Sequence, residues 1–154
     1  MAQTLVIVEI ANCKGTSKDT KYKDHHEMDS ISFGASNAKT FDSTSGAVGK
    51  PIFQDLQFSR SYVAGGSVQS FDNMVRGKKY DYMNIYLVER DDEAQSKEWL
   101  KIRVENCYVT AQSMHFHAGG TAESFSVCYE KMVITHVDNI KAGYHLTERK
   151  AVTS

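Results

Sequence analysis

Two histidines, His115 and His117, are the residues best placed for chemistry, because only one residue separates them. Residues two apart in an extended strand point to the same side, so the two imidazoles would share one face and could bind one metal ion. His136 could supply a third nitrogen ligand, and Glu123 lies close enough along the chain to supply a carboxylate. A metal-dependent β-barrel enzyme is therefore one interpretation. The simpler one is a pair of exposed histidines beside the glycine turn that follows.

The sequence offers little other catalytic machinery. His25 and His26 are adjacent, so in a strand they would point to opposite faces. The chain contains no G-x-S-x-G elbow, no G-x-G-x-x-G and no P-loop. Cys13, Cys107 and Cys128 are dispersed, odd in number and form no C-x-x-C pair, which predicts free thiols in a reducing compartment. We therefore predict no bound metal, no cofactor and no catalytic residue.

Length and charge narrow the class of protein. The chain has 154 residues, of which 41% are hydrophobic, and this is enough for one domain. Its 18 Lys+Arg and 19 Asp+Glu give a net charge of -1, which predicts no nucleic-acid partner. The apolar run at residues 5–8 is far too short to cross a membrane, so no membrane insertion is expected. Residues 1–4 carry no basic residue, and we expect no cleavable signal peptide.

Most of the chain alternates apolar and polar residues, which is typical of β-strands. The alternation predicts strands at residues 3–10, 26–37, 52–60, 79–89, 98–107, 108–117 and 121–137. One segment has helical spacing instead, capped by Ser67 and ended by Gly77, with four apolar residues on one stripe: Val68, Phe71, Met74 and Val75. The predicted fold is all-β with one short α-helix, a small β-barrel of two packed antiparallel sheets. The polar tail from residue 138 shows no clear pattern.

Two of the predicted strands carry an unusually small and polar face. In strand 26–37, alternation places Ile31, Phe33 and Ala35 on one face and four small residues on the other: Ser30, Ser32, Gly34 and Ser36. In strand 52–60, it places Leu56 and Phe58 with Gln54, and it places Phe53 with Asp55, Gln57 and Ser59. The intervening segment 38–49 is a long loop rich in Ser, Thr and Gly, with Phe41 and Val48 as its bulky apolar residues.

Several segments, taken in order, resemble one known family. They are K-G-T-S-K-D at residues 14–19, E-M-D-S-I-S-F-G at 27–34, F-Q-D-L-Q-F at 53–58, the helix ending at Gly77, and the strands around W-L-K-I, E-N-C-Y-V and E-S-F-S-V. This order is similar to that of the haemolysin-coregulated protein (Hcp) family, the tube protein of bacterial type VI secretion systems. The similarity extends from about residue 5 to residue 137.

The resemblance implies a β-barrel protomer at residues 1–137, with residues 138–154 as a tail of the same domain too short for a fused toxin. It implies homohexameric rings that stack into a tube, which a contractile sheath expels with its spike from a baseplate. Effector proteins would travel in the lumen, and the protein would wait in the bacterial cytoplasm before being secreted. The lumen would be lined by the small polar faces: Ser30, Ser32, Gly34, Ser36, Asp55 and Gln57. The long loop would reach a neighbouring protomer or ring through Lys39, Phe41 and Val48.

Two alternatives remain open at this stage. One is a cupin-like metal-binding β-barrel that uses His115, His117 and Glu123. The other is a monomeric β-barrel that binds a peptide or a sugar.

Overall fold

The computed structural model describes residues 3–11, 23, 25–37, 51–61, 64–90, 96–136, 140–146 and 150–152. Its elements, in chain order, are β1 (Gln3–Ile10), β2 (His26–Met28), β3 (Ser30–Ser32), β4 (Ala35–Asn37), β5 (Pro51–Phe53), β6 (Leu56–Arg60), α1 (Ala64–Val75), β7 (Lys79–Arg90), β8 (Ser96–His117), β9 (Gly120–Cys128), β10 (Lys131–His136), β11 (Lys141–His145) and β12 (Lys150–Ala151). The predicted all-β class with one helix is confirmed. No helix in the described part of the chain is long and apolar enough to cross a bilayer.

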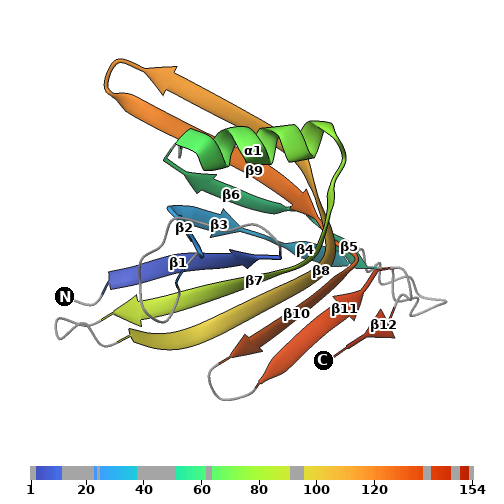
Figure 1. The fold of residues 1–154 in the computed structure, drawn as a ribbon. Helices are drawn as coiled ribbons and strands as arrows, with labels where there is room; N and C mark the ends of the chain where they lie inside the picture. Colours follow the sequence, from blue (N-terminus) through green and yellow to red (C-terminus); the bar gives the residue numbers. More distant parts are fainter. Residues whose placement is uncertain are drawn as a thin grey trace.

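The long strand β8 joins the two halves of the large sheet (Figure 1). Its first half pairs with β7 and β10, and its second half pairs with β9. The change of partner falls at Asn106, which takes a left-handed φ of 53°, a conformation that asparagine tolerates better than most residues. The result is one strand of 22 residues where the sequence predicted two.

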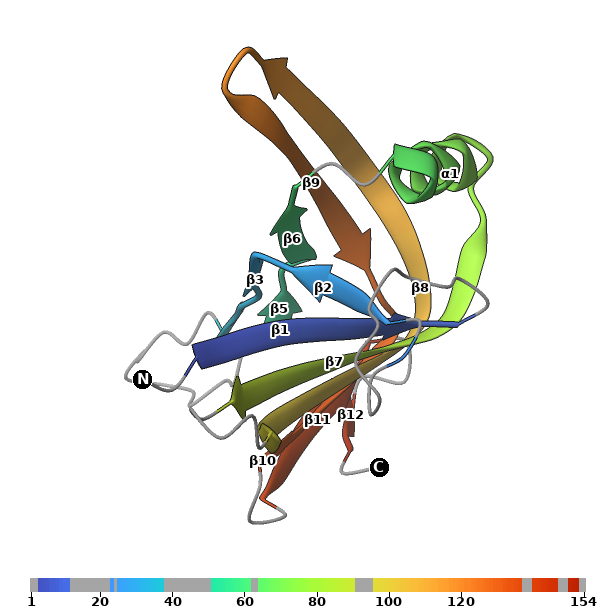
Figure 2. The same cartoon turned by 60° about the vertical axis from the view of Figure 1, so that its left-hand side comes forward.

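A second change of strand partner, at Asp29, bends the sheet further. β2 pairs with β1, whereas β3 pairs with β6, and only Asp29 separates β2 from β3. The backbone N–H of Asp29 donates to the carbonyl of Ser59 at 2.8 Å. The large sheet, all antiparallel, therefore curves around a shared core (Figure 2), and a small sheet, β4–β5, lies beside it. Within the described residues we find no hydrogen-bonded ladder that closes a barrel.

The core lies between the two halves of the large sheet. Leu56 and Phe58 of β6 are buried as predicted, and the rings of Phe58 and Phe125 stack at 5.0 Å. Val104 and Ile102 of β8 approach them from the other half and are fully buried. Burial of large apolar side chains from both halves is the main stabilising term for a domain of this size.

Two predicted strands are interrupted, and the interruption changes which residues face the core. Strand 52–60 is broken at residues 54–55, so Phe53 packs against the core instead of sharing an outer face with Gln57. Strand 121–137 is broken at residues 129–130, where the Tyr129 hydroxyl donates to the carbonyl of Gln54 at 3.1 Å. The alternation of apolar and polar residues does not reveal such breaks, because after each break the inward and outward positions are assigned anew.

The polar tail contributes two strands that the sequence did not predict, β11 and β12. The sequence analysis missed β11 in part because Gly143 interrupts the alternation of apolar and polar side chains that marks a strand. A Cβ at this position would lie 2.4 Å from the Met132 carbonyl oxygen and 2.9 Å from that of Val152. Glycine is therefore required by close packing of backbone against backbone.

Replacing Gly143 by alanine is expected to lower the free energy of unfolding by about 1–3 kcal/mol, because backbone atoms cannot move aside as a side chain can. Urea unfolding followed by circular dichroism measures the change. Ala142→Ser, at the exposed neighbouring position, is the control and should stay within about 0.5 kcal/mol of the parent. Equal stability of the two variants would contradict the packing argument.

Candidate functional site

A continuous outer surface of uncharged and mostly small polar residues is formed by four strands: β3, β6, β9 and the second half of β8. One row across the strands is formed by Ser30, Ser59, Ser124 and Ser113. The next row is formed by Ser32, Gln57, Ser126 and Ala111. We call these eight residues the serine face. None of them is charged.

Hydroxyl groups connect neighbouring strands of the serine face. Ser30 bonds to Ser59 side chain to side chain. Ser113 and Ser124 do the same at 2.8 Å, and Ser126 Oγ donates to Gln57 Oε1 at 2.8 Å. At the edge, Thr110 Oγ1 donates to Asp55 Oδ2 at 3.1 Å. Because these groups satisfy one another, the surface is wettable yet has few groups free to hold a passing protein.

The structure brings together four of the six residues predicted to line a lumen. Ser30, Ser32 and Gln57 lie on the serine face, and Asp55 lies at its edge. Gly34 lies in the link between β3 and β4, where its carbonyl accepts the N–H of Gln54 at 2.9 Å. Ser36 is exposed on the small sheet. The predicted loop residues fall outside the described part of the chain: Lys39, Phe41 and Val48.

A buried ionic cluster lies beneath this surface, on the core side of the same strands. Arg60 is 5% exposed and Glu123 is 1% exposed. Arg60 Nε donates to Glu123 Oε2 at 3.2 Å, and Gln112 Nε2 donates to Glu123 Oε1 at 2.7 Å. Arg60 Nη1 lies 3.0 Å from His26 Nδ1, which must accept because arginine can only donate. The sequence analysis missed this cluster, although Arg60 is in phase with Phe58 on the inward face of β6.

The residues considered as an alternative metal site do not all meet. The rings of His115 and His117 lie 5.4 Å apart, exposed near the tip of the β8–β9 hairpin. Glu123 pairs with Met114, so it points to the opposite face, where Arg60 holds it. His117 Nδ1 accepts the N–H of Gly119 at 3.2 Å. Among the described residues no group of three or more His, Cys, Asp or Glu could hold a metal ion.

His136, the third histidine considered for this alternative, pairs with Leu100 in the first half of β8, away from the histidines at the tip. The cupin-like set of ligands is therefore not assembled.

Three groups have a raised pKa because burial removes water from their charged forms. Desolvation, followed by the charge of Cys128, raises the pKa of the Cys107 thiol from 9.0 to about 12. Desolvation, followed by the charge of Glu9, raises the pKa of Tyr86 from 10.0 to about 12. Desolvation, followed by the charge of Asp55, raises the pKa of Tyr129 from 10.0 to about 12. Cys107 and Cys128 are free thiols, as predicted, and a buried thiol of high pKa makes a poor nucleophile.

Stability is expected to fall as the pH rises through 9 to 12. The folded protein keeps these three protons up to about pH 12, whereas the unfolded chain releases them from pH 9 or 10 upward. The stability that depends on these three protons is therefore fully present below pH 9 and is lost progressively as the pH rises toward 12. Urea midpoints at pH 8, 10 and 11 measure the decline. Tyr86→Phe should reduce the slope above pH 10, and an unchanged midpoint up to pH 11 would contradict the assignment.

The helix α1 turns three of the four residues of its apolar stripe away from the sheet. Its inward side carries Asn73, which donates from Nδ2 to the Tyr80 hydroxyl at 3.0 Å, and Met74, which packs against the core. The other three stripe residues are exposed: Val68 by 57%, Phe71 by 40% and Val75 by 66%. The predicted helix is confirmed, with its beginning at Ala64 rather than after Ser67. These three residues, however, are left exposed by the described part of the chain.

The β8–β9 hairpin extends past α1 and beyond the rest of the large sheet (Figure 1). Phe116, near its tip, is 58% exposed. Phe116 and the stripe on α1 are therefore exposed apolar side chains that another copy of the chain could cover.

Comparison with known proteins identifies relatives of one kind. A family model described as "Type VI secretion system effector, Hcp" matches residues 7–136. A structure titled as a type six secretion system protein has a TM-score of 0.85 and 16% identity, covering 97% of this chain and 100% of that one. Hcp1 from Salmonella typhimurium has a TM-score of 0.79 and 22% identity, covering 99% and 100%. Hcp1 from E. coli EAEC 042 has a TM-score of 0.75 and 18% identity, covering 93% and 97%. No curated protein sequence matches significantly.

Proposed function

The chain belongs to the Hcp family of type VI secretion tube proteins, and we propose that six copies form a ring and that these rings stack into the tube expelled during secretion. The proposal extends to the cargo, which we place inside the ring. It assigns the protein a role in assembly and transport rather than catalysis.

The exposed stripe on α1 is the observation that carries this proposal. Val68, Phe71 and Val75 would be covered if each protomer used α1 against a different surface of its neighbour. Such a head-to-tail contact closes into a ring when the rotation between copies fits the number of subunits. Family membership supplies the number six as the expectation to test.

The serine face is the surface we assign to the lumen. Cargo proteins must be released after delivery, so the wall that holds them should bind weakly. Hydroxyls that already bond to one another across the strands, such as Ser113 to Ser124, give a neutral and hydrated wall of this kind. Lys39, Phe41 and Val48 remain proposed contacts to the neighbouring protomer or ring.

The partners follow from the same proposal: copies of the chain itself, the sheath, the spike, the baseplate and effector proteins. Proteins of this family are secreted. We propose that this one resides in the bacterial cytoplasm before firing and leaves without a cleavable signal.

Light scattering of the purified protein, with negative-stain images of the same peak, tests the ring. The expected mass is about 104 kDa, six times 17.3 kDa. A monomer at both low and high concentration would contradict the proposal and favour the β-barrel binding module. Phe41→Ala should weaken the ring or the tube, and unchanged assembly of both would remove Phe41 from the contacts.

Ser32→Trp is expected to reduce effector delivery at least about tenfold while leaving the ring intact. Ser32 is exposed on the serine face, so the change should alter the free energy of unfolding by less than about 0.5 kcal/mol. Killing of a competitor strain measures delivery, and tube protein in the medium shows that secretion still occurs. Asp81→Trp, exposed on β7, is the control. Full delivery by Ser32→Trp would place the lumen on another surface.

A further inference from the structure

A basic groove crosses the outer face of β8, β10 and β11, in the half of the large sheet away from the serine face. Its volume is about 180 Å³. Val133 and Thr135 of β10 line it, and five charged side chains surround them: Lys101, Arg103, Glu105, Lys131 and Lys141. Four cations against one carboxylate give a local excess of three positive charges in a chain whose net charge is -1.

Gly143 stands beside Val133 in the paired strands β10 and β11, so no side chain rises from β11 at this position. A Cβ there would lie against the backbone carbonyl oxygens of Met132 and Val152, so close packing of the two strands requires the glycine.

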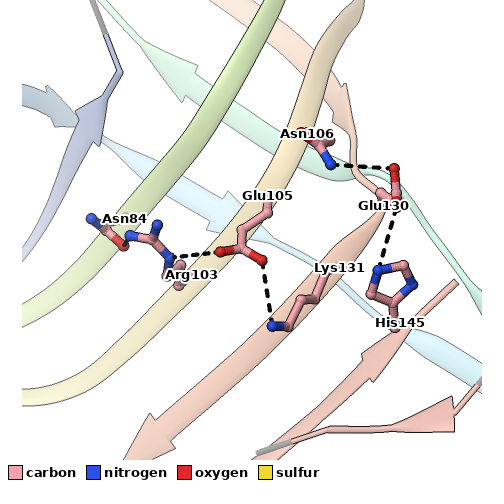
Figure 3. A network of polar contacts seen from close by, with 7 residues as sticks. All are labelled: Asn84, Arg103, Glu105, Asn106, Glu130, Lys131 and His145. Carbon is pink, nitrogen blue, oxygen red and sulfur yellow. Dashed lines mark hydrogen bonds and ion pairs between the residues drawn. The ribbon is translucent and has the colours of Figure 1, made fainter. Parts of the chain in front are cut away.

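Neighbouring groups hold the cations in place, as Figure 3 shows for Arg103 and Lys131. Arg103 donates from Nε to Glu105 at 3.3 Å and from Nη1 to Asn84 Oδ1 at 3.3 Å. Its guanidinium also lies 4.5 Å from the centre of the Tyr82 ring. Lys131 Nζ lies 3.5 Å from the other oxygen of Glu105. The carboxylate of Glu105 thus holds two cationic side chains in position. These side chains would therefore lose less conformational entropy when a ligand binds.

The other two cations are less engaged. Lys101 Nζ lies 5.6 Å from the centre of the Tyr86 ring, and Lys141 has no acidic partner among the described residues. Glu130 does not line the groove, and its carboxylate is directed to Asn106 and His145 (Figure 3). The groove therefore keeps a positive charge available to a ligand.

We propose that this groove binds an extended acidic segment of a partner protein, with carboxylates on alternate residues. Lys101, Arg103 and Lys131 occupy three successive rows along β8, since Lys131 pairs with Glu105. Alternate residues of a strand are about 6.8 Å apart, and the same spacing separates alternate side chains of an extended peptide. A segment lying along β8 would thus bring one carboxylate to each row. Lys141 would add a second cation to the row of Lys101, because Thr135 pairs with both of them.

A phosphate group fits the groove less well. The cations are spread along three rows of β8 and β10 rather than aimed at one point, which suits several spaced carboxylates better than a single phosphate. The backbone N–H groups of β8 and β10 are not offered either, because both strands pair with a neighbour on each side along the groove. Nucleic acid and polyphosphate are therefore outcomes of the test rather than the proposed ligand.

The proposal does not depend on the ring. The groove and the serine face lie on outer surfaces of opposite halves of the large sheet, with the core between them. A ring with the serine face in its lumen would carry the groove on another side, where a partner protein could reach it.

Fluorescence anisotropy with a labelled peptide, acetyl-Glu-Ser-Glu-Ser-Glu-Ser-Glu, tests the groove on the full chain. Binding should weaken at high salt and should exceed that of a peptide of the same composition with its glutamates in one block. Lys101→Gln/Lys141→Gln removes two charges without breaking an ion pair and should weaken binding at least about tenfold. Lys78→Gln/Lys79→Gln removes the same charge from exposed positions outside the groove and is the matched control.

Four results would overturn the proposal: no binding to the parent protein, equal binding of the block peptide, equal loss in the control variant, or tighter binding of polyphosphate or single-stranded RNA. Failure of the ring test leaves these measurements unaffected, because they need only the folded chain. Shifted amide resonances at Val133 and Gly143 on addition of the peptide would place it in the groove.

Discussion

Glu123→Ala is expected to lower the free energy of unfolding by about 3–5 kcal/mol, the largest loss of stability that we predict for a single side chain. Glu123 is 1% exposed and is held by Arg60 and Gln112. Its removal would leave the Arg60 guanidinium buried without its carboxylate. An uncompensated buried charge is far more destabilising than the loss of the ion pair itself.

Two further variants separate this explanation from a simple loss of packing. Arg60→Met/Glu123→Leu replaces both charges by apolar groups of similar size, and it should recover most of the lost stability. Glu105→Ala removes a carboxylate from half-buried ion pairs with Arg103 and Lys131 at the surface of the sheet, and it should cost less than about 1 kcal/mol. Urea unfolding of the four proteins gives the comparison. A double variant as unstable as Glu123→Ala would contradict the charge argument.

The fold class was predictable from the sequence because its signal is local. Strands with one buried face alternate regularly, as Leu56 and Phe58 do against Gln57, and α1 stands out by its helical spacing. The breaks at residues 54–55 and 129–130 were not predictable, since they depend on which strands become neighbours. Phe53 was consequently placed on the wrong face.

The candidate site was predictable only in part. Ser30, Ser32 and Gln57 meet as alternation suggested, yet their partners Ser124 and Ser126 come from a strand far along the chain. Regular alternation also shows a charged residue in a core position, as with Arg60, but it does not show that Glu123 lies opposite. Cross-strand register supplies that information, and register is a property of the folded sheet.

The helix stripe shows a different limit. Val68, Phe71 and Val75 have the spacing of a core-facing helix, although in one chain they face solvent. Spacing reports that a face is apolar, and it does not report whether the same chain or another copy covers it. The exposed stripe is thus a case where the failure of a core prediction points to an interface.

Phe71→Glu/Val75→Glu is expected to abolish the ring while leaving the protomer folded. Both side chains are exposed in one chain, so two carboxylates should change its free energy of unfolding by no more than about 1 kcal/mol. In a ring the same carboxylates would be buried against an apolar neighbour, and each would oppose every contact between subunits. Light scattering should show the mass falling from about 104 kDa to 17.3 kDa.

Gln69→Glu is the matched control, because it adds a carboxylate to α1 at an exposed position off the stripe. It should leave the ring intact, and far-UV circular dichroism should be the same for all three proteins. A ring that survives Phe71→Glu/Val75→Glu would exclude α1 from the contact between subunits. In that case Phe116, which is 58% exposed near the tip of the β8–β9 hairpin, becomes the next residue to vary.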